Sequence, residues 1–166
     1  MRLYVMRHGI ALDVGEEGVL TDAERPLSSD GRCKTTEVAK GLAAMGVHPD
    51  HVGTSPLVRA EQTARLAAGV LCQDAPVETC EFLLPGGRTA DLVRWIRDRG
   101  GEAALVVGHM PDLSRMISEL IGGKGAHAVE LKKAGVACVA FEEEPAIGQG
   151  WLEWLMQPAH LRRMRE

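Results

Sequence analysis

Short apolar runs alternate along this chain with longer segments whose apolar residues recur at helical spacing. The short runs predict β-strands at 2–6, 51–54 and 104–107. The longer segments predict helices at 29–45, 57–71, 89–98 and 112–122. Such alternation is typical of a largely parallel sheet that is covered by helices.

The last part of the chain has a different pattern. Two late strands are predicted at 135–141 and 150–156, on either side of an acidic stretch that contains proline and glycine, and they can form an antiparallel edge. A weaker strand is predicted at 76–80. We therefore expect an α/β fold, a three-layer α/β/α sandwich with a mostly parallel central sheet and an antiparallel edge.

The helix predicted at 29–45 has signals for both of its ends. Ser28 or Ser29 can accept hydrogen bonds from the first free amides, and Gly46 follows the last apolar residue as a stop. No repeat, low-complexity tract or long linker divides the sequence, so residues 1–166 are expected to form a single domain. A chain of this length buries enough surface to fold without a disulfide or a metal.

Composition narrows the functional classes. The formal net charge of -4 and the pI near 5.9 argue against general affinity for nucleic acid or an anionic membrane. The first apolar run is too short for a signal peptide or a membrane span, so a cytoplasmic protein is expected. The cysteines are widely scattered, which favours reduced thiols over a disulfide framework; they are Cys33, Cys72, Cys80 and Cys138.

The candidate chemistry lies where two predicted strands end. His8 and its neighbour Arg7 come directly after the first apolar run, and His109 comes directly after the run at 104–107. Arg59 lies near the start of the predicted helix 57–71. Because ligands of α/β proteins bind at the carboxyl ends of the strands, these four side chains are expected to converge on one anion.

Each of these side chains suits phosphoryl transfer. A neutral imidazole such as that of His8 can attack phosphorus near pH 7, and the phosphoimidazole that forms is labile. The planar guanidinium forks of Arg7 and Arg59 match the phosphoryl oxygens. His109, if protonated, would supply a further donor that stabilises charge in the transition state.

These residues resemble the histidine phosphatase superfamily, branch 1. The family signature is RHG after the first strand, then S-P-L-x-R-A-x-x-T-A, then a late G-H, and the chain has these at 7–9, 55–64 and 108–109. Further matches resemble the small SixA-like phosphohistidine phosphatases, over residues 1 to about 164; they are Pro26-Leu27-Ser28, Gly31-Arg32, Pro85-Gly86-Gly87 and Trp154-Leu155-Met156-Gln157-Pro158.

The resemblance implies a phosphoglycerate mutase-like fold and a hydrolase, a phosphatase, that needs no metal and no organic cofactor. By that resemblance His8 is transiently phosphorylated, while Arg7, Arg59 and His109 complete the catalytic and phosphate-binding pocket. A role in signal transduction is implied as well.

The substrate expected is a phosphohistidine on a signalling or phosphotransfer protein, with inorganic phosphate as product. Relatives that act on sugar phosphates carry RHG-E-x-x-x-N and a long insertion that supplies a glutamate acid, whereas Ile10 follows Gly9 here. Imidazole leaves readily once protonated, while an alkoxide benefits from a positioned acid. Two alternatives stay open: a phosphatase of small phosphate esters or sugar phosphates, with Glu81 as acid, and a non-catalytic phosphate- or partner-binding module.

Several further features have an ordinary and a functional interpretation. The segment 13–24, within the irregular stretch 10–27, carries five carboxylates and can form an acidic lip that repels bisphosphates and nucleotides, or a solvated loop. Ser55 and Thr63 are expected to cap a helix rather than to act in catalysis. The remaining candidates are expected to be incidental surface groups; they are Glu78, Arg88, His48, His51 and the tail arginines Arg162, Arg163 and Arg165. The oligomeric state stays open.

Overall fold

A six-stranded mixed sheet forms the centre of the computed structural model, which describes residues 1–73, 75–123 and 129–164. The strands lie in the order β3-β2-β4-β1-β5-β6. Their bounds are β1 Arg2–Arg7, β2 His51–Thr54, β3 Val77–Thr79, β4 Ala103–Gly108, β5 Val136–Ala140 and β6 Trp151–Met156. The first four strands pair in parallel, whereas β5 is antiparallel to β1, and β6 to β5.

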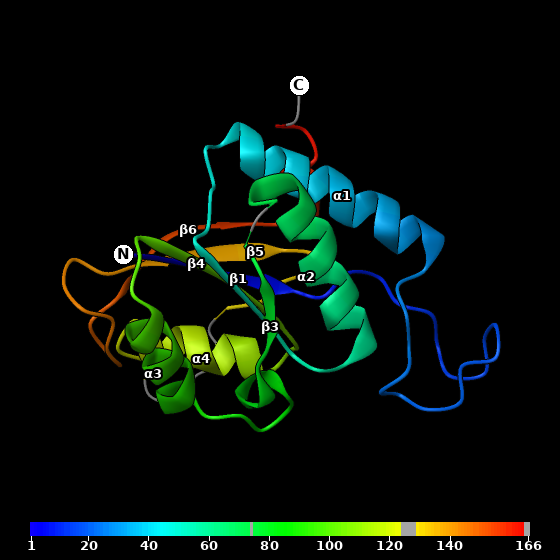
Figure 1. The fold of residues 1–166 in the computed structure, drawn as a ribbon, viewed down its shortest axis with the longest axis horizontal. Helices are drawn as coiled ribbons and strands as arrows, with labels where there is room; N and C mark the ends of the chain where they lie inside the picture. The colour runs from blue at the N-terminus through cyan, green and yellow to red at the C-terminus, as the bar shows by residue number, and fades with distance from the viewer. Residues whose placement is uncertain (74, 124–128, 165–166) are drawn as a thin grey trace.

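Helices cover both faces of this sheet, as Figure 1 shows. Their bounds are α1 Ser29–Ala44, α2 Val58–Leu71, α3 Thr89–Arg99, α4 Asp112–Leu120 and α5 Pro158–Leu161. Successive side chains of a strand point to opposite faces. In β1, Leu3 and Val5 therefore join the core under α3 and α4, while Tyr4 and Met6 join the core under α1, α2 and α5. The result is a three-layer α/β/α sandwich.

The elements predicted from the sequence agree closely with this architecture. Every predicted strand and long helix is present, with bounds that differ by at most two residues, and the antiparallel edge is confirmed. Ser28 caps α1, because its hydroxyl accepts a hydrogen bond from the Gly31 amide at 3.0 Å. Two short elements were not predicted, the 3-10 helix Glu81–Leu83 and α5, because a single turn leaves no periodicity in a sequence.

Residues 10–27 form the long loop that extends from one side of the sandwich in Figure 1. Its two ends are joined by a bridge between Ala11 and Leu27. The Val58 amide at the start of α2 donates to the Ala23 carbonyl at 3.2 Å. This loop therefore lies against the helix end that carries Arg59.

The structure also bears on the questions of a membrane span and of the cysteines. None of the helices in the described ranges is long and apolar enough to span a membrane. The cysteines, all within the described ranges, are free thiols, with Cys80 and Cys138 buried and Cys33 exposed.

Candidate active site

Three neighbouring strands bring the predicted chemistry to one edge of the sheet. The strands β2, β4 and β1 lie side by side, and their carboxyl ends are followed by Ser55, His109 and His8. The His8 amide donates to the Gly108 carbonyl at 3.1 Å, and the His8 and His109 ring centroids are 5.1 Å apart. Parallel pairing therefore brings together two histidines that are a hundred residues apart in the sequence.

The turn after His8 requires a glycine. A Cβ on Gly9 would lie 2.4 Å from the Thr35 hydroxyl of α1, closer than real Cβ contacts come. The Gly9 amide donates to the Thr63 hydroxyl at 2.9 Å, and that hydroxyl donates to the Arg59 carbonyl at 2.7 Å. Thr63 therefore ties the RHG turn to the first turn of α2, where Arg59 lies.

The His8 ring is held in one tautomer. Its Nδ1 lies 2.7 Å from the Gly9 carbonyl oxygen, which can only accept, so we assign the ring proton to Nδ1 and the free electron pair to Nε2. Burial lowers the pKa of His8 to about 3, and the Gly9 hydrogen bond only partly opposes that effect. His8 is therefore neutral at pH 7, with Nε2 available as a nucleophile.

Both arginines have part of their guanidinium fixed and part free. Arg7 donates from Nη1 to the Leu131 carbonyl at 2.8 Å, and Arg59 donates from Nη1 to the Asp22 carbonyl at 2.7 Å. The Nε atoms of Arg7 and Arg59 are buried without a hydrogen-bond partner among the described residues. Since buried donors are nearly always bonded, these free N–H groups suit an anionic ligand.

His109 differs from the sequence-based expectation in its charge. Burial, and then the nearby Arg59, lower the pKa of His109 to about 4, so the ring is neutral at pH 7 rather than protonated. Its Nε2 lies 2.8 Å from the Ser55 hydroxyl, which we assign as the donor. That leaves the proton on Nδ1, which is buried and unpartnered among the described residues, so His109 can donate without being charged.

The expected helix-capping role is wrong for Thr63 and right only in part for Ser55. The residue before α2 is Leu57, whose amide donates to the Ser55 hydroxyl at 3.4 Å, although no side chain caps the helix at Leu57 itself. The Ser55 hydroxyl also contacts His109, and the Thr63 hydroxyl bonds the Gly9 amide and the Arg59 carbonyl. Both hydroxyls thus contact the predicted site, and their place in the S-P-L-x-R-A-x-x-T-A segment was the sequence signal for this.

The acidic loop contributes a residue that sequence reasoning did not single out. The Asp22 carboxylate lies 3.1 Å from Arg59 and 3.1 Å from Arg25, and Arg25 also pairs with Asp13 at 2.7 Å. The hydrogen bond from Arg25, together with the charge of Arg59, holds the pKa of Asp22 below its usual range. Arginines thus neutralise part of the expected acidic lip. Asp22 directly contacts Arg59, which is predicted to bind phosphate.

The other candidates lie apart from these contacts. Glu81 lines a surface cavity with Arg88 and Trp95, and that cavity contains none of the four predicted site residues. Arg88 pairs with Asp91, and Glu78 pairs with Arg99. Among the residues that the structure describes, no cluster of three or more His, Cys, Asp or Glu side chains could hold a metal, at His48 and His51 or elsewhere.

One of the C-terminal arginines, Arg162, is only partly solvated. Arg162 packs against α1 and pairs with Glu37 at 3.5 Å, so the expectation of an incidental surface tail is wrong for this residue. Arg163 is exposed. Arg165 lies outside the described residues.

The two buried histidines make stability sensitive to acid. The folded-state pKa of His8, about 3, is below the unfolded value of about 6.5, so between these pH values the unfolded chain binds one more proton. Stability therefore falls as the pH falls through this window, by about 2 kcal/mol from His8 at pH 5. His109 adds to the loss in the same direction. Urea unfolding at pH 7 and pH 5 measures the difference.

His8→Gln is expected to lose about 2 kcal/mol less stability than the wild type between pH 7 and pH 5. The control is His160→Gln, at an exposed position, which should keep the wild-type acid sensitivity. An acid sensitivity that is the same in wild type and His8→Gln would contradict a buried neutral His8.

Comparisons with known proteins agree with the geometry. The histidine phosphatase superfamily (branch 1) matches over residues 3–84. An uncharacterized protein of Picosynechococcus sp. is 37% identical over 139 residues, which cover 82% of each chain. Phosphohistidine phosphatase SixA of Escherichia coli is 28% identical over 166 residues, which cover 98% of this chain and 97% of SixA.

Solved structures show the same relationship. The protein histidine phosphatase SixA complexed with tungstate superposes with a TM-score of 0.82 at 28% identity, covering 97% of this chain and 99% of that one. A phosphoglycerate mutase from Bacillus anthracis has a TM-score of 0.70 at 17% identity, covering 100% and 97%, and shares the fold. The phosphoglycerate mutase-like fold expected from the sequence is thereby confirmed. The chain is a phosphatase that belongs to the histidine phosphatase superfamily, branch 1, and resembles SixA within it.

Proposed function

We propose that this phosphatase removes the phosphoryl group from a phosphohistidine of a signalling or phosphotransfer protein, without a metal, through a phosphohistidine intermediate on His8. The observation that carries the proposal is the hydrogen bond from His8 Nδ1 to the Gly9 carbonyl, because it directs the free electron pair onto Nε2. Arg7, Arg59 and His109 bind the phosphoryl oxygens. The proposal also takes residues 1–166 as one catalytic domain and the cytoplasm as its location.

In the first step, His8 Nε2 attacks phosphorus while the bond from phosphorus to the substrate imidazole breaks. The free N–H groups of Arg7 and Arg59 bind the phosphoryl oxygens, and their positive charge balances the charge that spreads over those oxygens. His109 donates from Nδ1 to the same group. The substrate imidazole takes up a proton from solvent as it leaves.

In the second step, water attacks the phosphorus atom of phosphorylated His8. The bond from phosphorus to Nε2 breaks, inorganic phosphate departs, and the proton of the water passes to solvent. His8 returns to the neutral tautomer, because the Gly9 carbonyl keeps the proton on Nδ1 throughout. Two guanidiniums and one neutral N–H provide the charge stabilisation that a metal would otherwise supply.

The ionisation of nearby carboxylates supports a nitrogen leaving group. Asp22 contacts Arg59, and its lowered pKa keeps it ionised, so it has no proton to donate at neutral pH. Glu81 lines a separate surface cavity. An alkoxide leaving group gains about 10² to 10⁴-fold from a positioned acid, whereas an imidazole leaves with a conjugate-acid pKa of about 6.5. The similarity to phosphohistidine phosphatase SixA points to the same substrate class.

Phosphate release from a phosphohistidine-bearing phosphotransfer domain tests the proposal, with a phosphoserine protein and a small phosphate ester as comparisons. We expect kcat/KM for the phosphohistidine to exceed that for the esters by about 10²-fold or more, because neither Asp22 nor Glu81 is placed to protonate the alkoxide that leaves an ester. The phosphohistidine rate should be unchanged when a chelator is present.

Faster hydrolysis of the esters would favour the alternative, a phosphatase of small phosphate esters or sugar phosphates. In that case Glu81→Gln should lower the ester rate. Loss of activity in the presence of chelator, restored by added metal, would contradict the metal-independent mechanism.

A further inference from the structure

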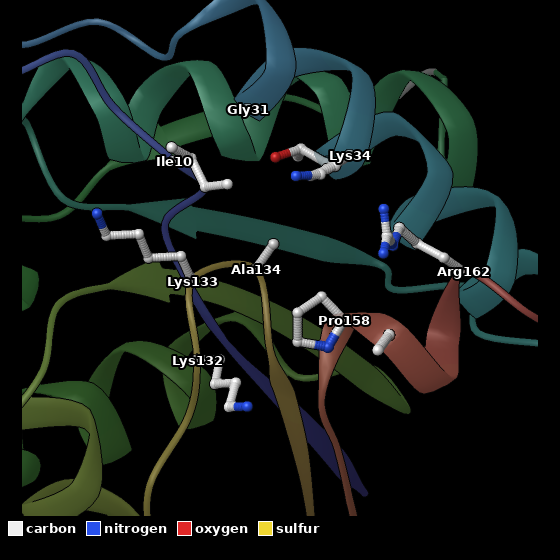
Figure 2. Close-up of a pocket in the computed structure, with 10 residues that line it drawn as sticks. Ile10, Gly31, Lys34, Lys132, Lys133, Ala134, Pro158 and Arg162 are labelled. Carbon is white, nitrogen blue, oxygen red and sulfur yellow. The ribbon is translucent and has the colours of Figure 1, made fainter.

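A groove with basic walls lies beside the proposed phosphate pocket. It has a volume of about 310 Å³ and lies between α1, the turn at 132–134 and the C-terminal segment that begins with α5 (Figure 2). Carbon atoms of Ile10, Ala134 and Pro158 contribute an apolar floor. The cations that line it are Lys34, Lys132, Lys133 and Arg162.

The backbone that lines the groove is adjacent to that of the proposed site. Ile10 is two residues after His8, so its backbone lies within about 8 Å of the nucleophile's backbone. On the opposite wall, the Ala134 amide donates to the carbonyls of Arg7 and His8, both at 3.1 Å. A chain that presents a phosphorylated side chain to His8 therefore has neighbouring residues within reach of the groove.

The charge of the groove contrasts with that of the protein. The chain has a formal net charge of -4, yet no acidic residue of the described ranges lines the groove. Lys34 pairs with Asp30 at 2.7 Å and Arg162 with Glu37 at 3.5 Å. Lys132 and Lys133 form no ion pair with any residue in the described part of the chain, so their charges are available to a partner.

Polar atoms in the groove wall also lack partners. Thr35 is fully buried at 0% exposure, and its hydroxyl has no hydrogen-bond partner among residues 1–73, 75–123 and 129–164. Nε of Arg162 is also a buried atom without a hydrogen-bond partner among these residues. A buried donor without a partner is rare in a folded protein. Both residues line the groove, so two unpartnered polar atoms lie beneath its surface.

We infer that this groove binds an acidic segment of the phosphorylated protein substrate, next to the phosphohistidine. The inference rests on the proposed function, because it assigns the place where that substrate docks. The cations lie apart from one another around an apolar floor, an arrangement that suits an extended segment better than one small anion (Figure 2). An acidic peptide uses both features, since its apolar side chains cover the floor while its carboxylates meet the lysines.

Two phosphohistidine peptides of equal length test this. In one, the phosphohistidine is flanked by Glu, Asp and Leu, and in the other each Glu and Asp is replaced by Gln and Asn. We expect the wild type to have a kcat/KM about tenfold higher for the acidic peptide, through a lower KM. Added salt should reduce this preference, because the lysines are at the surface.

The variant Lys132→Gln/Lys133→Gln is expected to remove most of the tenfold preference, while its rate on free phosphoramidate stays at the wild-type value. The matched control is Arg94→Gln/Arg97→Gln, which removes the same charge from α3 on the other face of the sheet. The control should keep the preference. Equal rates on both peptides, or a preference that survives in the lysine variant, would overturn the inference.

Binding of the same two peptides without phosphate separates this inference from the proposed function. The acidic peptide should bind the wild type about tenfold more tightly than the amide peptide, and the lysine variant should bind both equally. If neither phosphohistidine peptide is hydrolysed but this binding pattern is found, the groove is supported and the substrate proposal fails. If hydrolysis occurs without the binding difference, the groove assignment fails and the substrate proposal stands.

Discussion

Replacing His8 with alanine is expected to lower kcat on a phosphohistidine substrate by about 10⁴-fold or more, the size of effect seen when a catalytic nucleophile is removed. The reason is specific to one atom. Nδ1 of His8 is engaged by the Gly9 carbonyl, so only Nε2 can form the bond to phosphorus. The lowered pKa keeps that atom unprotonated over the whole neutral range. The neighbouring His109 does not offer an equivalent electron pair, because its Nε2 accepts from Ser55.

The measurement is rapid quenching with a substrate labelled on phosphorus. The wild type should carry a label on the protein that is stable in alkali and lost in acid, as expected for phosphohistidine, and His8→Ala should carry none. His109→Ala serves as the companion variant, because it should slow turnover yet still become labelled. Label on His8→Ala would contradict the assignment of His8 as nucleophile.

Replacing Arg59 with alanine is expected to lower kcat/KM by about 10²- to 10³-fold. Arg59 is almost fully buried, at 6% exposure, and its guanidinium is held in place by the Asp22 carbonyl, so it needs little reorganisation to bind a phosphoryl oxygen. Removal also takes away one of the two arginines that neutralise the Asp22 carboxylate, leaving it paired with Arg25 alone beside the incoming anion. Arg59→Lys should recover only part of the activity, because an ammonium lacks the planar fork.

Two further variants make this prediction specific. Arg65→Ala removes an exposed arginine from the same helix, where it pairs with Glu61, and should leave kcat/KM unchanged. In Arg59→Ala/Asp22→Asn the guanidinium is lost, but so is the repulsion between the Asp22 carboxylate and the phosphoryl group. This variant should therefore be several-fold more active than Arg59→Ala alone. If Arg59→Ala behaves like Arg65→Ala in steady-state assays, Arg59 is not a phosphate ligand.

The architecture could be predicted from the sequence because strands that are buried on both faces appear as continuous apolar runs. Leu3, Val5, Tyr4 and Met6 pack alternately into two cores, so the whole strand is apolar and the residues that end the run are polar. Parallel pairing then puts the ends of β1 and β4 at one edge of the sheet. From these two facts alone, His8 and His109 could be expected to be neighbours.

Contacts between separate structural elements could not be predicted from the sequence in this way. Asp22 is one of five carboxylates in a loop, and nothing in the local sequence distinguishes the one that meets Arg59, 37 residues away. Local spacing indicated that the Ser55 hydroxyl bonds an amide near the start of a helix, which it does at Leu57, but not that the same hydroxyl contacts His109. The cations of the groove come from three separate segments of the chain.

Local pattern therefore determined which residues form the strands, where those strands end and which side chains are candidates for phosphate chemistry, since each of these depends on neighbours in the sequence. Packing determined the ionisation and direction of those side chains. The neutral state of His109, the free Nε2 of His8 and the Asp22–Arg59 pair all arise from burial and from contacts between distant segments. Such effects depend on distances in space, and a sequence records only distances along the chain.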